Sequence, residues 1–311
     1  IRIFTGAAMP PDADTVLMQE DCREEDGYVI IPPGIKQGAN RRFAGEDITE
    51  GDVILTAGTR LRPQEIGLAA SIGRTELPVY DSIRVALFST GDEIRDTGGD
   101  LPPGCIYDAN RYSVAAALDR LGCAVSDLGI LPDDYDVIRY TLATAAENHD
   151  LIVTSGGVST GEEDHVRAAV DVLGHMHFWR LAIRPGRPLA LGQIGTVPFI
   201  GLPGNPVAVL VTFMRFARPA ILRLGGCRFI EPSTYRVRTG FPIHKKLGRR
   251  EWLRVRLEPD TDGNPVGYKF PQDGAGILTS MVASDGLVEL PEDLTSLEAG
   301  NMGDYLPFNE F

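Results

Sequence analysis

The stretch SGGVSTGEEDH at residues 155–165 places two adjacent glycines, several hydroxyls and three acids between an apolar run and a helix-like segment. Gly156 and Gly157 can adopt positive φ angles and bring backbone N–H groups close to a ligand. The hydroxyls that can donate to phosphate oxygens belong to Ser155, Ser159 and Thr160. The loop therefore predicts a phosphate-binding turn. It lacks the Gly-Lys-Ser/Thr ending of a P-loop, and a glycine-rich turn followed by a helix N-cap is the other interpretation.

Carboxylates accompany this loop and two others that follow apolar runs. They are Asp92, Glu93, Asp133, Asp134, Glu162, Glu163 and Asp164. Acids beside a phosphate are unfavourable unless a divalent cation lies between them, and Mg²⁺ is typically held by one or two carboxylates plus phosphate oxygens. We therefore expect a magnesium-phosphate site. A solvated helix N-cap is the alternative role for any single one of these acids.

A second cationic motif, FWRLAIRPGRP at 178–188, places Arg180, Arg184 and Arg187 within eight residues of an otherwise acidic chain. Two prolines and a glycine among them exclude a regular helix and indicate a stiff turn. Arginines held in this way bind phosphate, carboxylate or a small tetrahedral oxyanion. A surface cluster of salt bridges is the alternative.

Two further segments can contribute to such a site. The motif GLPGNP at 201–206 brings a rigid backbone to the start of a helix. In REWLRVRLE, Arg254 and Arg256 share one face of a strand, which is either solvated or turned towards a ligand. The five histidines show no metal-ligand spacing.

The elements that must position these residues alternate between strand and helix from about residue 82. Uniformly apolar strands such as DLIVT and VPFIGL predict an α/β domain with a doubly wound, mostly parallel sheet covered on both faces. Ligands of such sheets collect at the carboxyl ends of the strands. The loops at 88–93, 154–164 and 201–206 all fall at that edge.

The flanking regions differ from this core in texture. Short strands are predicted over 15–21, 28–33 and 52–59, with a helix over 62–73 that begins near Pro63. After residue 231 the pattern is entirely β and predicts a β-barrel-like domain. The predicted division is a partial β-rich domain at 1–55, a linker with a helix at 56–80, the α/β domain at 81–227 and the all-β domain at 228–311.

Composition limits the partners and the compartment. The 311 residues contain 30 Lys and Arg against 43 Asp and Glu, a net charge of -13 that disfavours nucleic acid and anionic lipid as partners. Four cysteines without CxxC spacing, no signal peptide and no apolar run of membrane-spanning length predict a cytoplasmic protein. The chain opens on IRIFTG without an initiator Met, and we expect polypeptide before Ile1.

Together these motifs resemble the molybdopterin molybdenumtransferase family, which includes bacterial MoeA, the plant Cnx E domain and the gephyrin E domain. The matching runs include IRIFTGAAMPPDADTVLMQED, VALFSTGDE, IYDANR, DLIVTSGGVSTGEEDHV, FWRLAIRPGRP and GLPGNPVA, in order over nearly all of residues 1–226. The resemblance implies a Mg²⁺-dependent enzyme that takes adenylylated molybdopterin and molybdate, hydrolyses the adenylate and releases AMP. It also implies a homodimer, with the adenylyltransferase and acceptor molybdoenzymes as contacts.

The resemblance assigns functional positions residue by residue. It places Glu93, Asp133 and Asp164 with the metal and the adenylate phosphates, and it makes Thr5 a functional threonine. The remaining positions that it assigns to the cofactor are Arg180, Pro203, Gly204, Asn205 and Pro206. Those that it assigns to molybdate are Arg184, Arg187, Pro188 and Arg254.

The chain departs from the family pattern at several points. The lysines of the family's KPGKP motif are replaced by Arg184 and Arg187, which leaves the choice between molybdate and tungstate open. Ala275 stands where the family often has Ser, and the family's N-terminal segment with its functional Asp is absent from residues 1–311. Two alternatives stay open: a molybdopterin adenylyltransferase with the same core, and a binding or scaffold protein that retains the fold.

Overall fold

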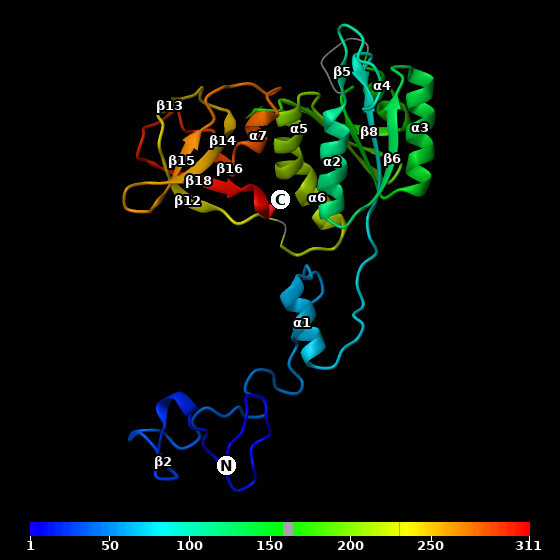
Figure 1. Ribbon diagram of the computed structural model, residues 1–311. Coiled ribbons are helices and arrows are strands. Elements are labelled where there is room, and N and C mark those ends of the chain that lie inside the picture. Colours follow the sequence, from blue (N-terminus) through cyan, green and yellow to red (C-terminus); the bar gives the residue numbers. More distant parts are fainter. Residues whose placement is uncertain (158–163, 230) are drawn as a thin grey trace. The chain divides into compact units, whose positions relative to one another are not determined.

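The computed structural model describes residues 1–157, 164–229 and 231–311. The chain forms two compact units (Figure 1). The first comprises residues 1–56 and 61–75, and the second comprises residues 57–60 and 76–311.

The first unit contains little regular structure. Its elements are the 3-10 turn η1 (Gln19–Asp21), strands β1 (Arg23–Glu25) and β2 (Tyr28–Ile30), and helix α1 (Pro63–Ser71). The helix is confirmed and begins with Pro63 in its first position, where a missing N–H costs nothing. The strands expected over 15–21 and 52–59 do not form. Within residues 1–75, β1 and β2 pair only with each other, so the other extended segments there have no neighbouring strand to form a sheet with.

The second unit is built around a six-stranded sheet in the order β6-β3-β7-β11-β10-β8. Pairings β6–β3, β3–β7 and β7–β11 are parallel, which confirms the doubly wound, mostly parallel sheet. The strands of this sheet are β3 (Arg84–Thr90), β6 (Ala124–Leu131), β7 (Leu151–Ser155), β8 (Gly174–Arg180), β10 (Pro188–Ile194) and β11 (Val197–Leu202). Short strands β4 (Ile94–Arg95) and β5 (Ile106–Tyr107) pair beside it.

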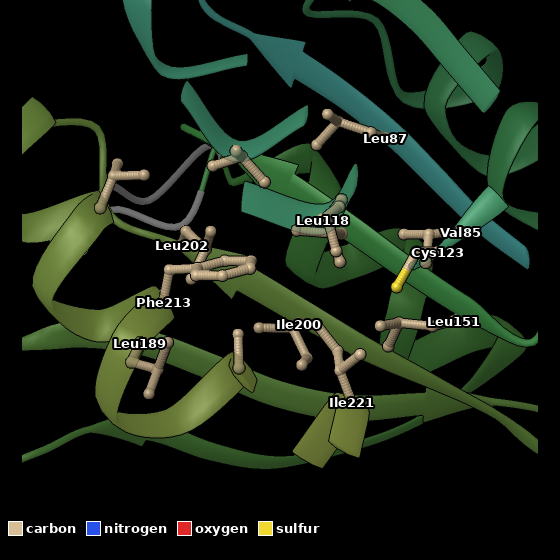
Figure 2. Close-up of a cluster of buried hydrophobic side chains, with 14 residues drawn as sticks. Val85, Leu87, Leu118, Cys123, Leu151, Leu189, Ile200, Leu202, Phe213 and Ile221 are labelled. Atoms are coloured by element: carbon tan, nitrogen blue, oxygen red, sulfur yellow. The ribbon is translucent and has the colours of Figure 1, made fainter. Parts of the chain in front are cut away.

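Helices cover both faces of the sheet. They are α2 (Ala109–Arg120), α3 (Tyr135–Asn148), α4 (His165–Leu173), α5 (Pro206–Thr212), the π-helical turn η2 (Phe213–Ala217) and α6 (Arg218–Leu224). One face packs under α2, α5 and α6, where Val85, Leu118, Ile200 and Phe213 form part of a buried cluster (Figure 2). The other packs under α3 and α4 through a second cluster that includes Phe88. The uniformly apolar strands reflect this burial on both faces.

The end of the sheet nearest β8 differs from the predicted parallel arrangement. Strands β10 and β11 form an antiparallel hairpin, and β8 pairs antiparallel with β10 although no strand was expected over 174–180. This edge strand carries exposed polar residues such as His175 and His177, so its sequence has no continuous apolar run.

The C-terminal part forms a closed barrel, as predicted. Its strands follow the order β15-β12-β18-β16-β14, and β15 also pairs with β14. They are β12 (Tyr235–Thr239), β14 (Arg250–Pro259), β15 (Pro265–Lys269), β16 (Gly286–Leu290) and β18 (Met302–Pro307). The smaller elements are β9 (Ile183–Arg184), β13 (Ile243–His244), β17 (Ser296–Leu297), α7 (Thr279–Val282) and η3 (Phe308–Glu310). Strand β9 joins the barrel by pairing parallel with β14, so the arginine turn connects the two sheets.

Three helices begin at an aspartate N-cap. The side chains of Asp108, Asp134 and Asp164 accept from the backbone N–H groups of the residues three positions later. Among the helices outside residues 158–163 and 230, none is long and apolar enough to cross a membrane.

Candidate active site

A cavity of about 380 Å³ lies between the α/β core and the barrel. Its walls are the turn at 183–188, the loop at 203–205, strand β14 and the segment at 269–275. The sequence-derived residues that line it are Arg184, Arg187, Pro188, Pro203, Gly204, Asn205 and Arg254. Arg256 is exposed and pairs with Glu258 instead. The fold therefore collects the arginine turn, the GLPGNP loop and one barrel arginine at a single site.

The arginine turn is anchored by close packing. Gly186 has a φ of +91°, and a Cβ there would lie 2.5 Å from the Cγ2 atom of Thr212 in α5. The backbone N–H of Leu181 donates to the carbonyl oxygen of Arg187 at 3.0 Å and closes the turn. Only glycine satisfies both the left-handed backbone and this contact.

The cavity is strongly cationic. Among the described residues that line it, the cations are Arg184, Arg187, Arg249, Arg254 and Lys269, and the acids are Glu251 and Asp273. The hydrogen bond from Lys269, 2.9 Å long, holds the pKa of Asp273 below its usual value. Asp273 therefore stays ionised, and the excess of positive charge among the lining residues fits a small oxyanion.

Arg254 is buried and forms no ion pair with a carboxylate of the described residues. Its side chain donates to the carbonyl oxygens of Gly274 at 3.2 Å and Gln272 at 3.1 Å. Its Nε has no hydrogen-bond acceptor within the described part of the chain, and burial lowers its pKa. A desolvated guanidinium with an unused donor is suited to an incoming anion.

The loop at 203–206 links this cavity to the edge of the sheet. The backbone N–H of Gly156 donates to the carbonyl oxygen of Leu202 at 3.3 Å, and the Ser155 hydroxyl lies 3.5 Å from that of Pro203. From the other side, the Asn110 side chain donates to the carbonyl oxygen of Gly204 at 2.7 Å. The phosphate-type turn and the cationic cavity therefore share one rigid segment.

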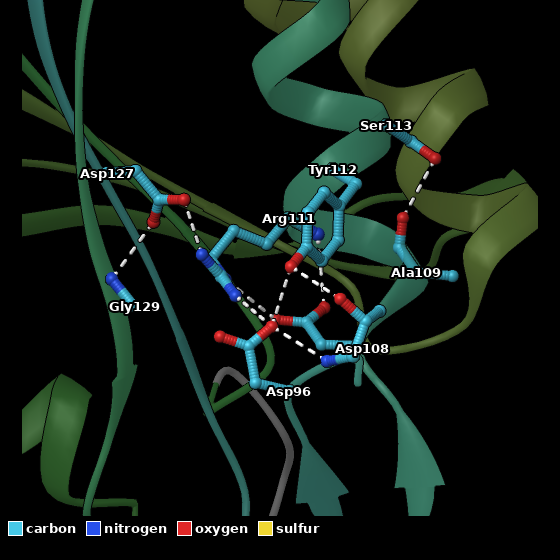
Figure 3. Close-up of polar contacts among 9 residues, drawn as sticks. Asp96, Asp108, Ala109, Arg111, Tyr112, Ser113, Asp127 and Gly129 are labelled. Carbon is cyan, nitrogen blue, oxygen red and sulfur yellow. Dashed lines mark hydrogen bonds and ion pairs between the residues drawn. The ribbon is translucent and has the colours of Figure 1, made fainter. Parts of the chain in front are cut away.

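Arg111, next to Asn110, anchors the start of α2. Its guanidinium lies among three carboxylates, those of Asp96, Asp108 and Asp127 (Figure 3). Burial acts to lower the pKa of Arg111, but the hydrogen bonds to Asp127 and Asp108 and the charges of Asp127 and Asp96 outweigh burial and raise it. This buried network fixes the helix that carries Asn110.

The turn after β7 shows the close backbone approach that its glycines predict. A Cβ at Gly156, whose φ is +85°, would lie 2.5 Å from the carbonyl oxygen of Thr90. A Cβ at Gly157, whose φ is +63°, would collide with the Thr90 hydroxyl. The hydroxyls of Ser89, Thr90 and Thr154 are buried and have no partner within the residues that the structure describes. Unsatisfied donors at one sheet edge indicate a place for a polar ligand.

Asp164 caps α4 and retains one unused oxygen. Its Oδ1 accepts from the Arg167 backbone N–H at 2.9 Å, whereas Oδ2 is buried and has no partner within the described ranges. Burial raises the pKa of Asp164, and the charge of Asp133 adds to the increase. Glu93 and Asp133 are exposed. No group of three or more His, Cys, Asp or Glu residues outside 158–163 and 230 is arranged to hold a metal, so the magnesium set stays a prediction.

The other predicted residues lie elsewhere. Thr5 belongs to the first unit, and Ser159 and Thr160 lie outside the described residues. Arg180 is exposed at the end of β8 and is not part of the cavity wall, and Pro206 occupies the first position of α5.

Sequence reasoning missed four charged residues of the cavity: Arg249, Glu251, Lys269 and Asp273. One signal was available, because Glu251 opens the run EWLRV, where a buried strand would otherwise carry an apolar residue. No comparable signal marked the others.

Three family models match successive parts of the chain. Residues 1–73 match the family described as MoeA N-terminal region (domain I and II). Residues 86–223 match a probable molybdopterin binding domain, and residues 236–308 match the MoeA C-terminal region (domain IV).

Individual relatives agree with these matches. The molybdopterin molybdenumtransferase of Haemophilus influenzae is 36% identical over 99% of the chain and 77% of the relative. That of Nostoc sp. is 37% identical over 96% of the chain and 70% of the relative. A molybdopterin biosynthesis moeA protein from Pyrococcus horikoshii superimposes with a TM-score of 0.76 at 26% identity, over 95% of this chain and 72% of that one.

Proposed function

The chain belongs to the molybdopterin molybdenumtransferase family, an enzyme family of molybdenum cofactor biosynthesis, and we propose that it inserts molybdate into adenylylated molybdopterin with release of AMP. One observation carries the proposal. Pro203 and Gly204 line the cationic cavity, while the Ser155 hydroxyl lies 3.5 Å from the carbonyl oxygen of Pro203. An oxyanion site and a phosphate-type turn thus meet at one segment.

The cavity supports the binding of molybdate. Arg184 and Arg187 reach it from the rigid turn, and Arg254 reaches it from β14 with an unused Nε donor. Molybdate is a tetrahedral dianion, and guanidinium groups are well suited to tetrahedral oxyanions. Pre-formed donors in a partly enclosed site lose little free energy through reorganisation.

The turn after β7 supports the binding of the diphosphate bridge. In the reaction, water attacks one phosphorus atom, the bridging P–O bond breaks, AMP leaves and molybdopterin keeps the other phosphate. The protons of the water pass to the product phosphates or to solvent. Backbone N–H groups around Gly156 and Gly157 and the hydroxyls of Thr90 and Thr154 would orient the phosphates.

A magnesium ion fits Asp164 in this scheme. The buried Oδ2 of Asp164 has no partner among the described residues, and burial together with the charge of Asp133 raises the pKa of that carboxyl. A cation bound between the two acids would offset both effects. Asp164, Asp133 and Glu93 would hold the ion, which supplies charge neutralisation at the phosphates when bound. The protein groups then contribute positioning of the phosphates.

The proposal also covers the compartment, the oligomeric state and the partners of the enzyme. We place the chain in the cytoplasm as a homodimer, with Thr5, Ser159, Thr160 and Arg180 as further contacts of the cofactor. The adenylyltransferase that supplies the adenylate and the acceptor molybdoenzymes are the expected partners. These assignments rest on the family.

The deciding experiment supplies the purified protein with adenylylated molybdopterin, Mg²⁺ and molybdate. It follows AMP release together with activation of a cofactor-free molybdoenzyme. We expect both signals to appear and to depend on molybdate. Consumption of ATP with formation of the adenylate would favour the adenylyltransferase alternative, and tight binding with neither signal would favour a scaffold.

A further inference from the structure

Glu251 pairs with Arg184 and Arg249, two of the arginines that line the cationic cavity. It lies on β14 with only 1% of its side chain exposed. Its Oε1 accepts from Nε and Nη2 of Arg249 at 3.0 and 2.5 Å. Its Oε2 accepts from Nη1 of Arg184 at 3.4 Å. The carboxylate therefore bridges a barrel arginine and an arginine of the turn.

The two contacts differ in strength. The contact with Arg249 is short and uses two donors of one guanidinium, whereas the contact with Arg184 is long. Arg184 also lies 3.9 Å from Asp273, and 49% of its side chain is exposed. Neither contact of Arg184 with these two acids has good hydrogen-bond geometry. Its guanidinium can therefore turn from the acids towards an incoming anion at a small cost in free energy.

The excess of positive charge in the cavity suggests a function for the weak contact between Glu251 and Arg184. Five cations and two acids line the cavity among the described residues, so a dianion would meet a large positive excess. A transferase must release its oxyanion to the acceptor, and binding that is equally tight before and during the reaction does not speed it. An internal carboxylate that competes with the ligand lowers ground-state affinity.

We propose that Glu251 is a positioning residue that competes with molybdate for Arg184 and thereby keeps the bound oxyanion exchangeable. The inference rests on the proposed function of the cavity. Glu251 stays paired with Arg249 whether or not molybdate is bound, whereas Arg184 turns from Glu251 to the ligand when molybdate binds. Asp273 acts on Arg184 in the same direction, more weakly because it is half-exposed.

The test is the dissociation constant of molybdate for the full chain, measured by equilibrium dialysis with molybdenum counted by mass spectrometry. Glu251→Gln keeps the shape and one acceptor for Arg249 but removes the charge. We expect the dissociation constant to fall at least about tenfold. At saturating molybdate, kcat for insertion should fall, and KM for molybdate should fall with it. A purely structural Glu251 would instead raise both the dissociation constant and KM.

Glu292→Gln is the matched control. Glu292 pairs with Arg250 at 2.8 Å, does not line the cavity, and loses the same charge on substitution. Its molybdate affinity should remain that of the wild type, because an exposed charge outside the cavity is screened. Equal tightening in both variants would attribute the effect to net charge and overturn the proposal.

Asp273→Asn keeps the test decisive if Glu251→Gln does not fold. Its dissociation constant should also fall, by a smaller factor, and an unchanged or higher value in the folded variant would overturn the proposal. The wild type separates this inference from the proposed function. A wild-type chain that binds no molybdate would refute the proposed oxyanion site itself, whereas normal binding with weaker or unchanged binding in Glu251→Gln refutes only the role of Glu251.

Discussion

The backbone N–H of Val207, in the first turn of α5, donates to the carbonyl oxygen of Ala275 at 2.9 Å. This bond connects the GLPGNP loop of the α/β core with the segment that follows β15 of the barrel. Both segments line the cationic cavity. This backbone hydrogen bond therefore joins two walls of the cavity. It limits how far the walls can separate while side chains adjust to a ligand.

Asp164→Asn should separate activity from stability. Burial raises the pKa of Asp164 above the ordinary 3.8, so the ionised form is disfavoured in the folded state. Its contribution to stability is lost as pH rises from that value through the folded pKa, and at pH 7 the charge is a cost. Asn retains the cap for α4. We expect a melting temperature that is unchanged or up to about 3 °C higher, with AMP release reduced about 100-fold or more.

Asp134→Asn is the matched control for that substitution. Asp134 caps α3 in the same way, with Oδ1 accepting from the Val137 N–H at 3.0 Å, but it is exposed. Its AMP release should equal that of the wild type. Addition of Mg²⁺ should raise the melting temperature of the wild type and of Asp134→Asn, but not of Asp164→Asn. Equal turnover in both variants would exclude Asp164 from the reaction.

Gly186→Ala should disrupt the arginine turn. A Cβ there meets Thr212 Cγ2 at 2.5 Å, and the φ of +91° is strained for alanine. We expect a loss of about 1–3 kcal/mol in the free energy of unfolding and at least about tenfold weaker molybdate binding. Urea titration and equilibrium dialysis measure the two effects.

Gly195→Ala isolates the backbone strain from the collision. Gly195 has a φ of +57° in the β10–β11 turn, and a Cβ there meets nothing within 4 Å. This variant should lose about 1 kcal/mol of stability while binding molybdate normally. Equal loss of binding in the two variants would show that the turn is not a specific support for Arg184 and Arg187.

Arg254→Met should weaken oxyanion binding without a large loss of stability. The substitution removes a buried charge that pairs with no carboxylate in the described part of the chain. That gain offsets the loss of hydrogen bonds to Gly274 and Gln272. We expect molybdate affinity to fall at least about tenfold and the free energy of unfolding to change by less than about 1.5 kcal/mol. Arg256→Met, an exposed change on the same strand, should leave affinity unaltered. A collapse of stability in Arg254→Met would indicate a structural role.

Arg111→Met should be strongly destabilising. The side chain of Asp108 is 1% exposed and would be left as a buried carboxylate without a cation. Such losses cost about 3–5 kcal/mol. Arg84→Met removes an exposed partner of Asp150 and should cost less than about 1 kcal/mol. Urea unfolding compares the two, and similar losses would contradict the assigned importance of the buried network.

Much of this architecture could be predicted from the chain alone. Uniformly apolar strands such as 151–155 require cover on both faces, and aspartates before helices at 108, 134 and 164 provide local caps. Both signals are local, because each lies within a few residues of the strand or helix that it predicts. The N-terminal strands at 15–21 and 52–59 failed as predictions because a strand also needs a partner, which local sequence does not supply.

The same distinction between local sequence and tertiary structure applies to the candidate site. The residue types and spacing of the arginine turn and the GLPGNP loop determined that an oxyanion and a phosphate were the ligands to expect. Only the tertiary structure brought Glu251 to Arg184, across 67 residues, through the parallel pairing of β9 with β14. It also showed that Asp134 is an exposed cap whereas Asp164 keeps a buried, unused oxygen. Burial and pairing between distant strands depend on how the two sheets pack, and no local pattern encodes that packing.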